Sequence, residues 1–192
     1  MITTEQVKEL RDKTGVSIMQ CKKALEEVEG DIEKALVVLK KKSGEIAAKK
    51  SDRELGAGAI GSYLHSNGSV AGMVILSCET DFVANNEDFK QMAYDIAMQV
   101  TAMNPEYISK DEIPENALKT AEEVFKKEVE DKPKDIQEKV LSGKVDAYFK
   151  DKILLLQPLI KNPDMTVQGL IEAGTQKFGE KIAITKFVRL SV

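Results

Sequence analysis

The sequence has little of what metal sites, redox chemistry and nucleic-acid binding require. Its 192 residues include no tryptophan, one histidine and two cysteines, and aromatic residues make up only 5%. A zinc site needs three or four histidine, cysteine or carboxylate ligands brought together, so we predict no metal site and no cofactor. Side chains that stack on single-stranded bases are equally scarce.

Charge and hydropathy exclude two further classes of protein. Lysine and arginine number 28 against 32 aspartates and glutamates, and the net charge of −4 argues against a dedicated nucleic-acid binder. No run approaches the ~18 consecutive apolar residues of a membrane span. The first residues also lack the basic and apolar regions of a signal peptide, so we expect a protein of the cytoplasm.

The cysteines and the histidine leave one enzymatic hypothesis open. Cys78 with His65 as its base would make a thiol nucleophile, because a thiolate needs a nearby base. Packed cysteines and a surface histidine account for the same residues without any chemistry. We favour this second interpretation and expect a protein that is not an enzyme.

Residues 1–52 are predicted to form a three-helix domain and a basic linker. Thr3 and Gln6 have the spacing of a capping box, and Ser17 and Asp31 are expected to begin the second and third helices. Helices this short are unstable alone and must pack together, which predicts a module of the ubiquitin-associated type. Gly15 and Gly30 are the expected ends of the first two helices. The second helix is expected to pack through an apolar stripe made of Ile18, Cys21, Leu25 and Val28.

Residues 40–53 carry six cations against two acidic residues, a local balance of +4. Such a run can bind phosphates, or it can be a solvated helix end and linker. We favour the linker, with steering toward an acidic partner as a secondary role.

Residues 53–192 are predicted to form an α+β domain in which helices cover an antiparallel sheet. Segments 60–65 and 70–78 flank Asn67-Gly68, a strong signal for a hairpin. A hairpin plus a distant last strand, with helices on one face, is an α+β architecture. The remaining expected elements are a strand over 181–190 and helices from about residue 86, over about 114–131, over 134–150 and over about 166–178.

The glycines of the run GAGAIG, residues 56–61, match the spacing of a dinucleotide-binding turn. That function requires the glycines to lie between a strand and the start of a helix. Here they follow a charged linker and run into a strand. We therefore predict that they ease the backbone into the sheet or allow strands to approach each other closely.

A large apolar side chain stands in the short turn between the second strand and the next helix. Thr80 to Val83 occupy this turn, so Phe82 is held beside the charged Asp81 on a rigid connection. Phe82 either caps the core while Asp81 bonds nearby backbone, or it is a preorganised aromatic anchor for a partner's pocket. The residues alone leave both interpretations open.

Two long motifs resemble the translation elongation factor Ts family. They are CETDFVA at residues 78–84 and LRDKTGVSIMQCKKAL at residues 10–25, in the order and spacing of the family. The run LQPLI at residues 156–160 resembles a third family segment. The resemblance covers essentially the whole chain, and the length matches the short members.

The resemblance implies a guanine-nucleotide exchange factor for the GTPase elongation factor Tu. Such a factor binds the GDP-bound partner, promotes GDP release and is displaced when new nucleotide binds, so it needs no catalytic residues. In the family an Asp-Phe pair enters the partner's nucleotide domain and leads to dislocation of Mg²⁺ there. Mapped by resemblance, that region is Thr80, Asp81, Phe82 and Val83, with Phe82 as the wedge and Asp81 as its polar orienter.

The resemblance also implies contacts from the three-helix module, through Arg11, Ile18 and Met19. A helical wheel places Ile18 on the core stripe and Met19 outside, so we favour packing for Ile18 and partner contact for Met19. Arg11 is either a contact or a solvated cation at a helix end. Tyr63 and His65, which share one strand face, are weaker candidates for contact.

Short members of the family pair as homodimers, so the resemblance predicts a homodimer that forms a two-to-two complex. Elongation factor Tu is the expected partner in its GDP-bound and nucleotide-free states, with no direct nucleic-acid contact. An interaction adaptor of the ubiquitin-associated type, without exchange activity, fits the fold and charge equally well. Only the Asp-Phe motif and the resemblance of the second domain separate the two hypotheses.

Overall fold

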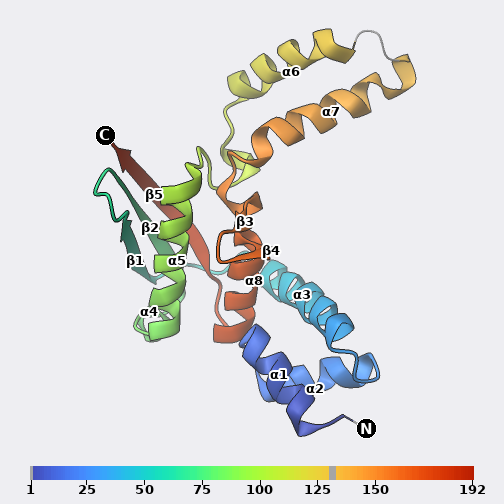
Figure 1. The fold of residues 1–192 in the computed structure, drawn as a ribbon, viewed down its shortest axis with the longest axis vertical. Helices are drawn as coiled ribbons and strands as arrows, with labels where there is room; N and C mark the ends of the chain where they lie inside the picture. Colours follow the sequence, from blue (N-terminus) through green and yellow to red (C-terminus); the bar gives the residue numbers. More distant parts are fainter. Residues whose placement is uncertain (1, 130–132) are drawn as a thin grey trace.

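The computed structural model describes residues 2–129 and 133–192 of the chain (Figure 1). Its mixture of helices and antiparallel strands confirms the predicted α+β class. In chain order the elements are α1 (Thr4–Thr14), α2 (Ile18–Glu27), α3 (Ile32–Lys49), β1 (Ala57–Leu64), β2 (Val70–Cys78), α4 (Asp81–Ala84), α5 (Glu87–Met103), the single turn η1 (Lys110–Glu112), α6 (Glu115–Val129), α7 (Lys134–Lys150), the single turn η2 (Leu154–Leu156), β3 (Pro158–Leu159), β4 (Asn162–Thr166), α8 (Val167–Phe178) and β5 (Ala183–Ser191).

The starts of the first three helices and the end of α1 are set by the capping residues that the sequence predicts, whereas α2 ends at Glu27 and not at the predicted Gly30. The Thr3 N–H donates to Gln6 Oε1 (2.9 Å) and the Gln6 N–H donates to Thr3 Oγ1 (3.2 Å), which is the expected capping box. Ser17 and Asp31 cap α2 and α3. Gly15 follows α1 with a φ of 66°, a conformation that favours glycine. The three helices enclose a core of their own, made of Val7, Leu10, Val16, Cys21, Ala24, Leu25, Ala35 and Leu39.

Helix α3 corrects the prediction of a linker over residues 40–53. It continues to Lys49, so only the last residues of that segment connect the helix to the sheet. The inner stripe of the helix runs on past Leu39 to the buried Ser43, whose hydroxyl donates to Leu39 O and to Gln176 Oε1 of α8. The lysines are good helix formers and cost little on the solvent side, so positive charge does not end the helix.

The predicted hairpin and distant last strand form one three-stranded antiparallel sheet in the order β1-β2-β5. The β1–β2 ladder runs from the pair Ala57–Cys78 to the pair Leu64–Ala71. The His65 N–H donates to Val70 O across the turn, where Gly68 has a φ of 70°. The Asn67-Gly68 signal therefore sets the register of the sheet.

Helix α5 lies directly against β1. A Cβ built on Gly61 would lie 2.1 Å from the Ala93 carbonyl oxygen of α5. The close approach at Gly61 is thus between a strand and a helix. The predicted close approach of strands is confirmed at Gly58, where a Cβ would lie 2.6 Å from the Leu76 carbonyl oxygen of β2. The inward side of α5 then packs in the main core, with Phe89, Met92, Ala93, Ile96, Ala97 and Val100 as sequence periodicity predicts.

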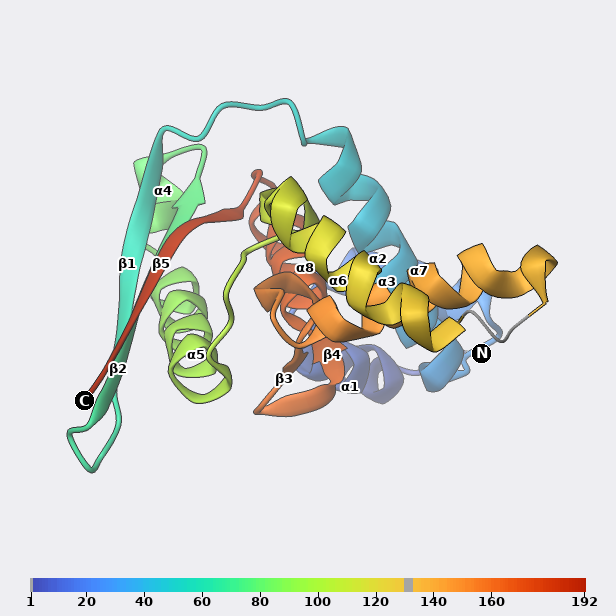
Figure 2. The same ribbon diagram turned by 90° about the horizontal axis from the view of Figure 1, so that it is seen from above.

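The sheet has a covered face and an open face. Figure 2 shows β1, β2 and β5 with α5 and the rest of the chain on one side only. The second layer also contains α8, which contributes Val167 and Ile171 to the main core and ends at Gly179 as predicted. Helix α8 also packs against α3, and this contact connects the main core to the N-terminal helices.

Helices α6 and α7 form a hairpin that extends away from the rest of the chain, at the end opposite α1 and α2 (Figure 1). They begin just after Pro114 and Pro133, as predicted. The expected end of the first helix near residue 131 lies outside the described residues. The base of the hairpin has a third core, formed by Ile113, Ala121, Val145, Phe149 and Ile153.

The small β3–β4 hairpin was not predicted. Pro158 pairs with Thr166 and Leu159 with Asn162, a ladder too short to produce an alternating pattern in the sequence. Within the described residues, no helix is long and apolar enough to cross a membrane.

Candidate functional site

The connection between β2 and α5 presents an aromatic side chain to solvent. The predicted turn over Thr80 to Val83 contains the one-turn helix α4, which runs from Asp81 to Ala84. Val83 and Ala84 face the main core and are buried, whereas Asp81 and Phe82 point outward. The Phe82 side chain is 84% exposed, so the structure excludes the interpretation in which it caps the core.

Because Phe82 is exposed, its side chain contributes little hydrophobic free energy to the stability of the fold. Burying a phenylalanine side chain is worth about 1.5–3 kcal/mol, and the chain obtains none of it at this position. The Asp81 carboxylate beside it is exposed, and among residues 2–129 and 133–192 it takes part in no hydrogen bond or ion pair. Both groups are therefore available to a partner.

Thr80 fixes the start of this turn through all of its polar atoms. Its N–H and hydroxyl donate to the Glu180 carboxylate, at 3.0 and 2.6 Å. Its carbonyl oxygen accepts from the Cys78 thiol (3.1 Å) and from the Ala84 N–H (3.2 Å). The exposed pair thus stands on a backbone that is held from two sides.

The thiol-enzyme hypothesis fails on geometry and on electrostatics. Cys78 pairs with Ala57 at one end of β1 and His65 follows the other end, so roughly eight residues at ~3.3 Å each separate them. Burial raises the pKa of the Cys78 thiol, and the carboxylates of Glu180 and Glu79 raise it further. Cys78 therefore stays a neutral thiol that donates to Thr80, and Cys21 lies in the separate N-terminal core.

The three N-terminal candidates are all exposed, which corrects the prediction for Ile18. Its side chain is 58% exposed, against 69% for Met19, so it does not belong to the core stripe. Ile18 is the first residue of α2, and the packed stripe begins one turn later at Cys21. Arg11 lies in the last turn of α1 with an exposed side chain. Val37 of α3, 68% exposed, is a further apolar surface residue that the sequence did not single out.

Tyr63 and His65 lie on the same side of the β1 edge, with ring centroids 6.3 Å apart. Tyr63 is half-buried and packs edge-to-face on Tyr94 of α5, at 5.8 Å. His65 is exposed beyond the end of the strand. Because His65 and the start of α4 lie at opposite ends of the β1–β2 ladder, the structure does not bring them together.

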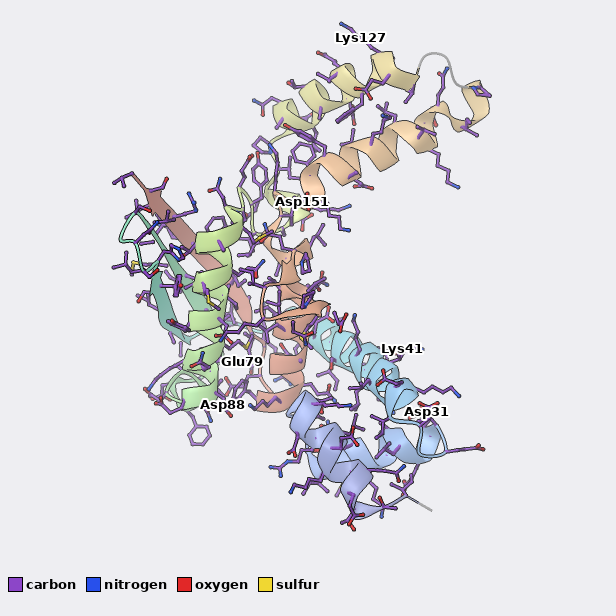
Figure 3. The ribbon with its side chains drawn as sticks, in the orientation of Figure 1. Asp31, Lys41, Glu79, Asp88, Lys127 and Asp151 are labelled. Carbon is purple, nitrogen blue, oxygen red and sulfur yellow. The ribbon has the colours of Figure 1, made fainter. Side chains whose placement is uncertain are left out.

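The end of the core that carries α4 is braced by ion pairs. Asp88 at the start of α5 pairs with Lys177 of α8 at 2.8 Å. Glu79 pairs with Arg53 at 3.2 Å, and both acidic residues lie in the lower part of the core next to α4 (Figure 3). The first pair joins α5 to α8, and the second joins the turn after β2 to the segment before β1.

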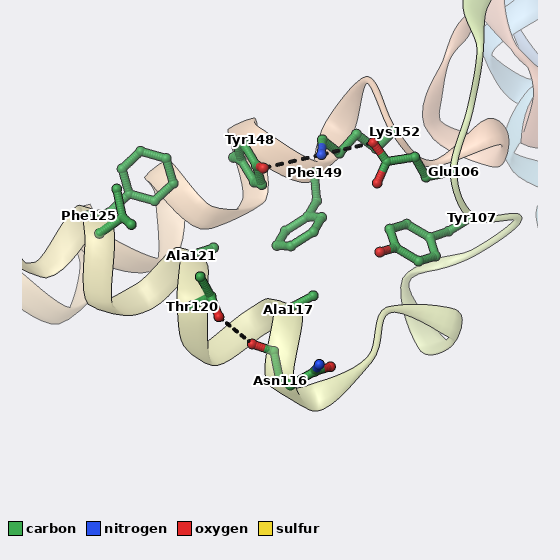
Figure 4. A pocket seen from close by; sticks show the side chains of 11 residues that line it. Glu106, Tyr107, Asn116, Ala117, Thr120, Ala121, Phe125, Tyr148, Phe149 and Lys152 are labelled. Atoms are coloured by element: carbon green, nitrogen blue, oxygen red, sulfur yellow. Dashed lines mark hydrogen bonds and ion pairs between the residues drawn. The ribbon is translucent and has the colours of Figure 1, made fainter.

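A shallow cavity of about 310 Å³ lies elsewhere, at the base of the α6–α7 hairpin. Tyr148 and Phe149 stack edge-to-face at 4.9 Å, and Lys152 Nζ bonds Glu106 Oε1 (2.9 Å) and the Tyr148 hydroxyl (3.2 Å) (Figure 4). These two bonds raise the pKa of Lys152. None of the site residues predicted from the sequence lines this cavity. In the described parts of the chain, no group of three histidine, cysteine or acidic residues is arranged to hold a metal ion.

The open face of the sheet is a second surface, and sequence reasoning missed it. Its apolar side chains, between 37% and 66% exposed, are Ile60, Leu64, Met73, Ile75, Val188 and Leu190. The ladders align Ile60 with Ile75 and Met73 with Val188, so the six lie in adjacent rows. The signal was present in residues 70–78, which are apolar at successive positions and hence on both faces of the strand.

Comparison with known proteins identifies the family. The model of the family described as "Elongation factor TS" matches residues 3–192, nearly the whole chain. The chain belongs to the elongation factor Ts family. Elongation factor Ts of Syntrophomonas wolfei subsp. wolfei is 46% identical over 194 aligned residues, which cover 100% of this chain and 91% of that protein.

Other elongation factor Ts proteins match over comparable lengths. That of Thermodesulfovibrio yellowstonii is 45% identical, covering 100% of this chain and 96% of its own. That of Thermosipho melanesiensis is 41% identical, covering 100% of this chain and 99% of its own. The resemblance inferred from residues 10–25 and 78–84 is thus confirmed along the whole chain.

Proposed function

We propose that the chain is the guanine-nucleotide exchange factor for elongation factor Tu, as membership of the elongation factor Ts family implies. The observation that supports the mechanism most directly is the 84% exposed Phe82, on a turn in which Thr80 is hydrogen-bonded and Val83 and Ala84 are buried. An aromatic side chain held in this way loses little conformational entropy on entering a pocket. The protein works by binding and needs no catalytic group or cofactor of its own.

In the proposed mechanism Phe82 is the wedge and Asp81 supplies a polar contact beside it. Thr80 and Val83 complete the segment, the first by fixing its start and the second by anchoring it in the core. Insertion into the nucleotide domain of elongation factor Tu leads to dislocation of the Mg²⁺ held there. GDP and the exchange factor then weaken each other's binding, and this coupling is reciprocal. Each tenfold loosening of GDP requires about 1.4 kcal/mol of coupling.

The N-terminal helices are proposed as a docking module of the ubiquitin-associated type, within a domain over residues 1–52 that precedes a core domain over 53–192. The exposed Met19 and Ile18 offer adjacent apolar contacts, and Arg11 adds a positive charge on the preceding helix. His65, at the far end of β1, is a weaker contact. The module gives affinity for the GDP-bound and nucleotide-free partner, while the wedge speeds release.

A homodimer formed through the open sheet face completes the proposal. Rows of exposed isoleucine, leucine, methionine and valine suit a second copy of the same face, and the charged Lys186 lies beside Ile75 in the same sheet. Two copies would carry two docking modules and two wedges, giving a two-to-two complex. We place this assembly in the cytoplasm, with no direct contact to nucleic acid.

Release of labelled GDP from preloaded elongation factor Tu tests the function. Substoichiometric protein should accelerate release catalytically, whereas an adaptor of the ubiquitin-associated type would bind the partner without turnover. Phe82→Ala should lower the release rate by at least about tenfold, equivalent to roughly 1.4 kcal/mol. Its stability should be unchanged, because Phe82 is exposed.

Tyr148→Ala is the control for Phe82→Ala. It removes a half-exposed aromatic side chain, which packs on Phe125 and Phe149, from the α6–α7 hairpin. Its circular dichroism spectrum confirms folding and its exchange rate should equal that of the parent. Normal nucleotide exchange by a folded Phe82→Ala protein would refute the assignment of Phe82 as the wedge.

A further inference from the structure

The helix that carries Phe82 is too short to hold its own shape. It has four residues, and the side chain of its N-cap residue, Thr80, makes no hydrogen bond to the amides of the first turn. Isolated helices of this length are far from stable in water. Burial of Val83 and Ala84 anchors one side of the turn, but it does not fix the backbone that enters it.

Glu180 supplies the missing support from the α8–β5 connection. Its Oε2 accepts the Glu79 N–H (3.1 Å) and the Thr80 N–H (3.0 Å), while Oε1 accepts the Thr80 hydroxyl (2.6 Å). The hydroxyl that ordinarily caps a helix is thus given to a carboxylate 100 residues away in sequence. Hydrogen bonds to an ionised acceptor are stronger than neutral ones.

Glu79 returns the same kind of contact in the opposite direction. Its carboxylate accepts the Lys181 N–H (2.6 Å) and lies 3.2 Å from Arg53 Nη1. We call Glu79 and Glu180 the carboxylate clamp, because each carboxylate binds the backbone of the other's connection. Lys181 Nζ also donates to Ser51 O (2.6 Å) and Arg53 O (2.8 Å), so the chain leaving α3 joins the same cluster.

We propose that Glu180 is a positioning residue for nucleotide exchange: it holds the turn at Thr80 so that Phe82 is presented to the partner in one conformation. The inference rests on the proposed function of Phe82 and adds how the fold prepares it. Glu180 acts within the fold and does not itself contact the partner. Its loss should leave docking almost intact and slow the step in which Phe82 enters.

The absence of tryptophan gives a direct probe of this ordering. Phe82→Trp introduces a single indole whose fluorescence anisotropy reports the mobility of the side chain. In this background Glu180→Ala should lower the anisotropy, and Glu180→Asp should lower it similarly because the shorter carboxylate cannot reach Thr80. Glu180→Gln should keep it, since the amide oxygen still accepts the two N–H groups and the amide can donate to the Thr80 hydroxyl.

Exchange kinetics provide the functional readout. Glu180→Ala and Glu180→Asp should lower the maximal rate of GDP release about five- to tenfold, with less than about a threefold change in the half-saturating concentration. Glu180→Gln should stay within about threefold of the parent. Glu54→Ala, which removes an exposed carboxylate from the segment before β1, is the matched control and should change neither value.

A double-mutant cycle separates this inference from the proposed function. If Glu180 acts through Phe82, Phe82→Ala with Glu180→Ala should be no slower than Phe82→Ala alone. If the two substitutions instead reduce the exchange rate by independent, multiplicative factors, the inference is wrong. It is also wrong if the anisotropy is unchanged in folded Glu180→Ala. Where that variant does not fold, Glu180→Asp provides the same test. Normal exchange by Phe82→Ala alone would instead refute the function of the wedge, and the anisotropy would still decide whether Glu180 orders the turn.

Discussion

At the scale of single residues, the contact between the sheet and α5 is possible because Gly61 has no Cβ. Any Cβ there would meet the Ala93 carbonyl of α5 at 2.1 Å, and backbone atoms cannot move aside as a flexible side chain would. The neighbouring strand and helix both belong to the main core, so relief of the clash would separate them. Glycine is therefore required for packing here, in a motif whose spacing suggests nucleotide binding.

Gly61→Ala should accordingly lower the free energy of unfolding by more than about 2 kcal/mol, measured by urea denaturation. Gly143→Ala is the contrasting variant, because a Cβ at Gly143 on α7 meets no atom within 4 Å. It should raise stability by about 0.5–1 kcal/mol, as expected for glycine replaced inside a helix. Equal effects of the two substitutions would contradict the close approach.

Glu79 links stability to pH. The Lys181 N–H that it accepts, together with the Arg53 guanidinium, holds the pKa of the Glu79 carboxyl below its usual value of 4.5. A lowered folded-state pKa contributes stability that is present above the unfolded pKa and is lost as pH falls through the folded value.

Glu79→Gln should therefore be less stable than the parent at neutral pH, with a difference that shrinks once the pH falls below about 4.5. Thermal unfolding of both proteins between about pH 3 and pH 7 measures this. Because the carboxylate is partly exposed, added salt should also reduce the difference. A gap that stays constant with pH would show that Glu79 contributes only by packing.

At the scale of elements, α3 joins two cores. Its first half packs Ala35 and Leu39 against α1 and α2, and its second half places Ser43 against Gln176 of α8. The lysine-rich stretch is the outer face of this connection. The orientation of the N-terminal helices relative to the sheet is thus set by a helix.

Glu45→Pro tests the continuity of α3. Within a helix, proline removes one backbone hydrogen bond and clashes with the preceding turn, which costs about 3 kcal/mol or more. Glu54→Pro, beyond the helix end, removes the same charge and should cost far less. Comparable unfolding midpoints for the two variants would instead support a flexible linker over residues 40–53.

At the scale of the whole molecule, the two faces of the sheet have different roles. One face holds the main core against α5 and α8, and the other exposes rows of apolar side chains. Exposed apolar patches of this kind mark interaction surfaces. Pairing of two sheets across this face would give a shared second core to both copies.

Met73→Asp places a charge in the central strand of the open face. It should raise the dissociation constant of the proposed homodimer by at least about tenfold, because each copy would bury an unpaired carboxylate. Light scattering at micromolar concentration measures the mass, and Val124→Asp on exposed α6 is the control. A monomer mass for the parent protein would refute the dimer.

Much of the local structure, and the family, can be predicted from the sequence. Capping residues such as Thr3 and Asp31, the Asn67-Gly68 turn and the periodicity of α5 act within a few residues, so their effects can be predicted without tertiary contacts. The motif at residues 78–84 carried the resemblance. The short β3–β4 ladder escaped prediction because two residues carry no period.

The exposure of the candidate site residues, and the contacts that hold them, depend on tertiary packing. Ile18 lies outside the core because its helix begins one turn before the packing does, which a helical wheel does not show. Phe82 points outward because Val83 and Ala84 occupy the inner side of the same turn. The bonds from Glu180 to Thr80 join residues 100 apart in sequence, and no local pattern encodes a contact of that separation.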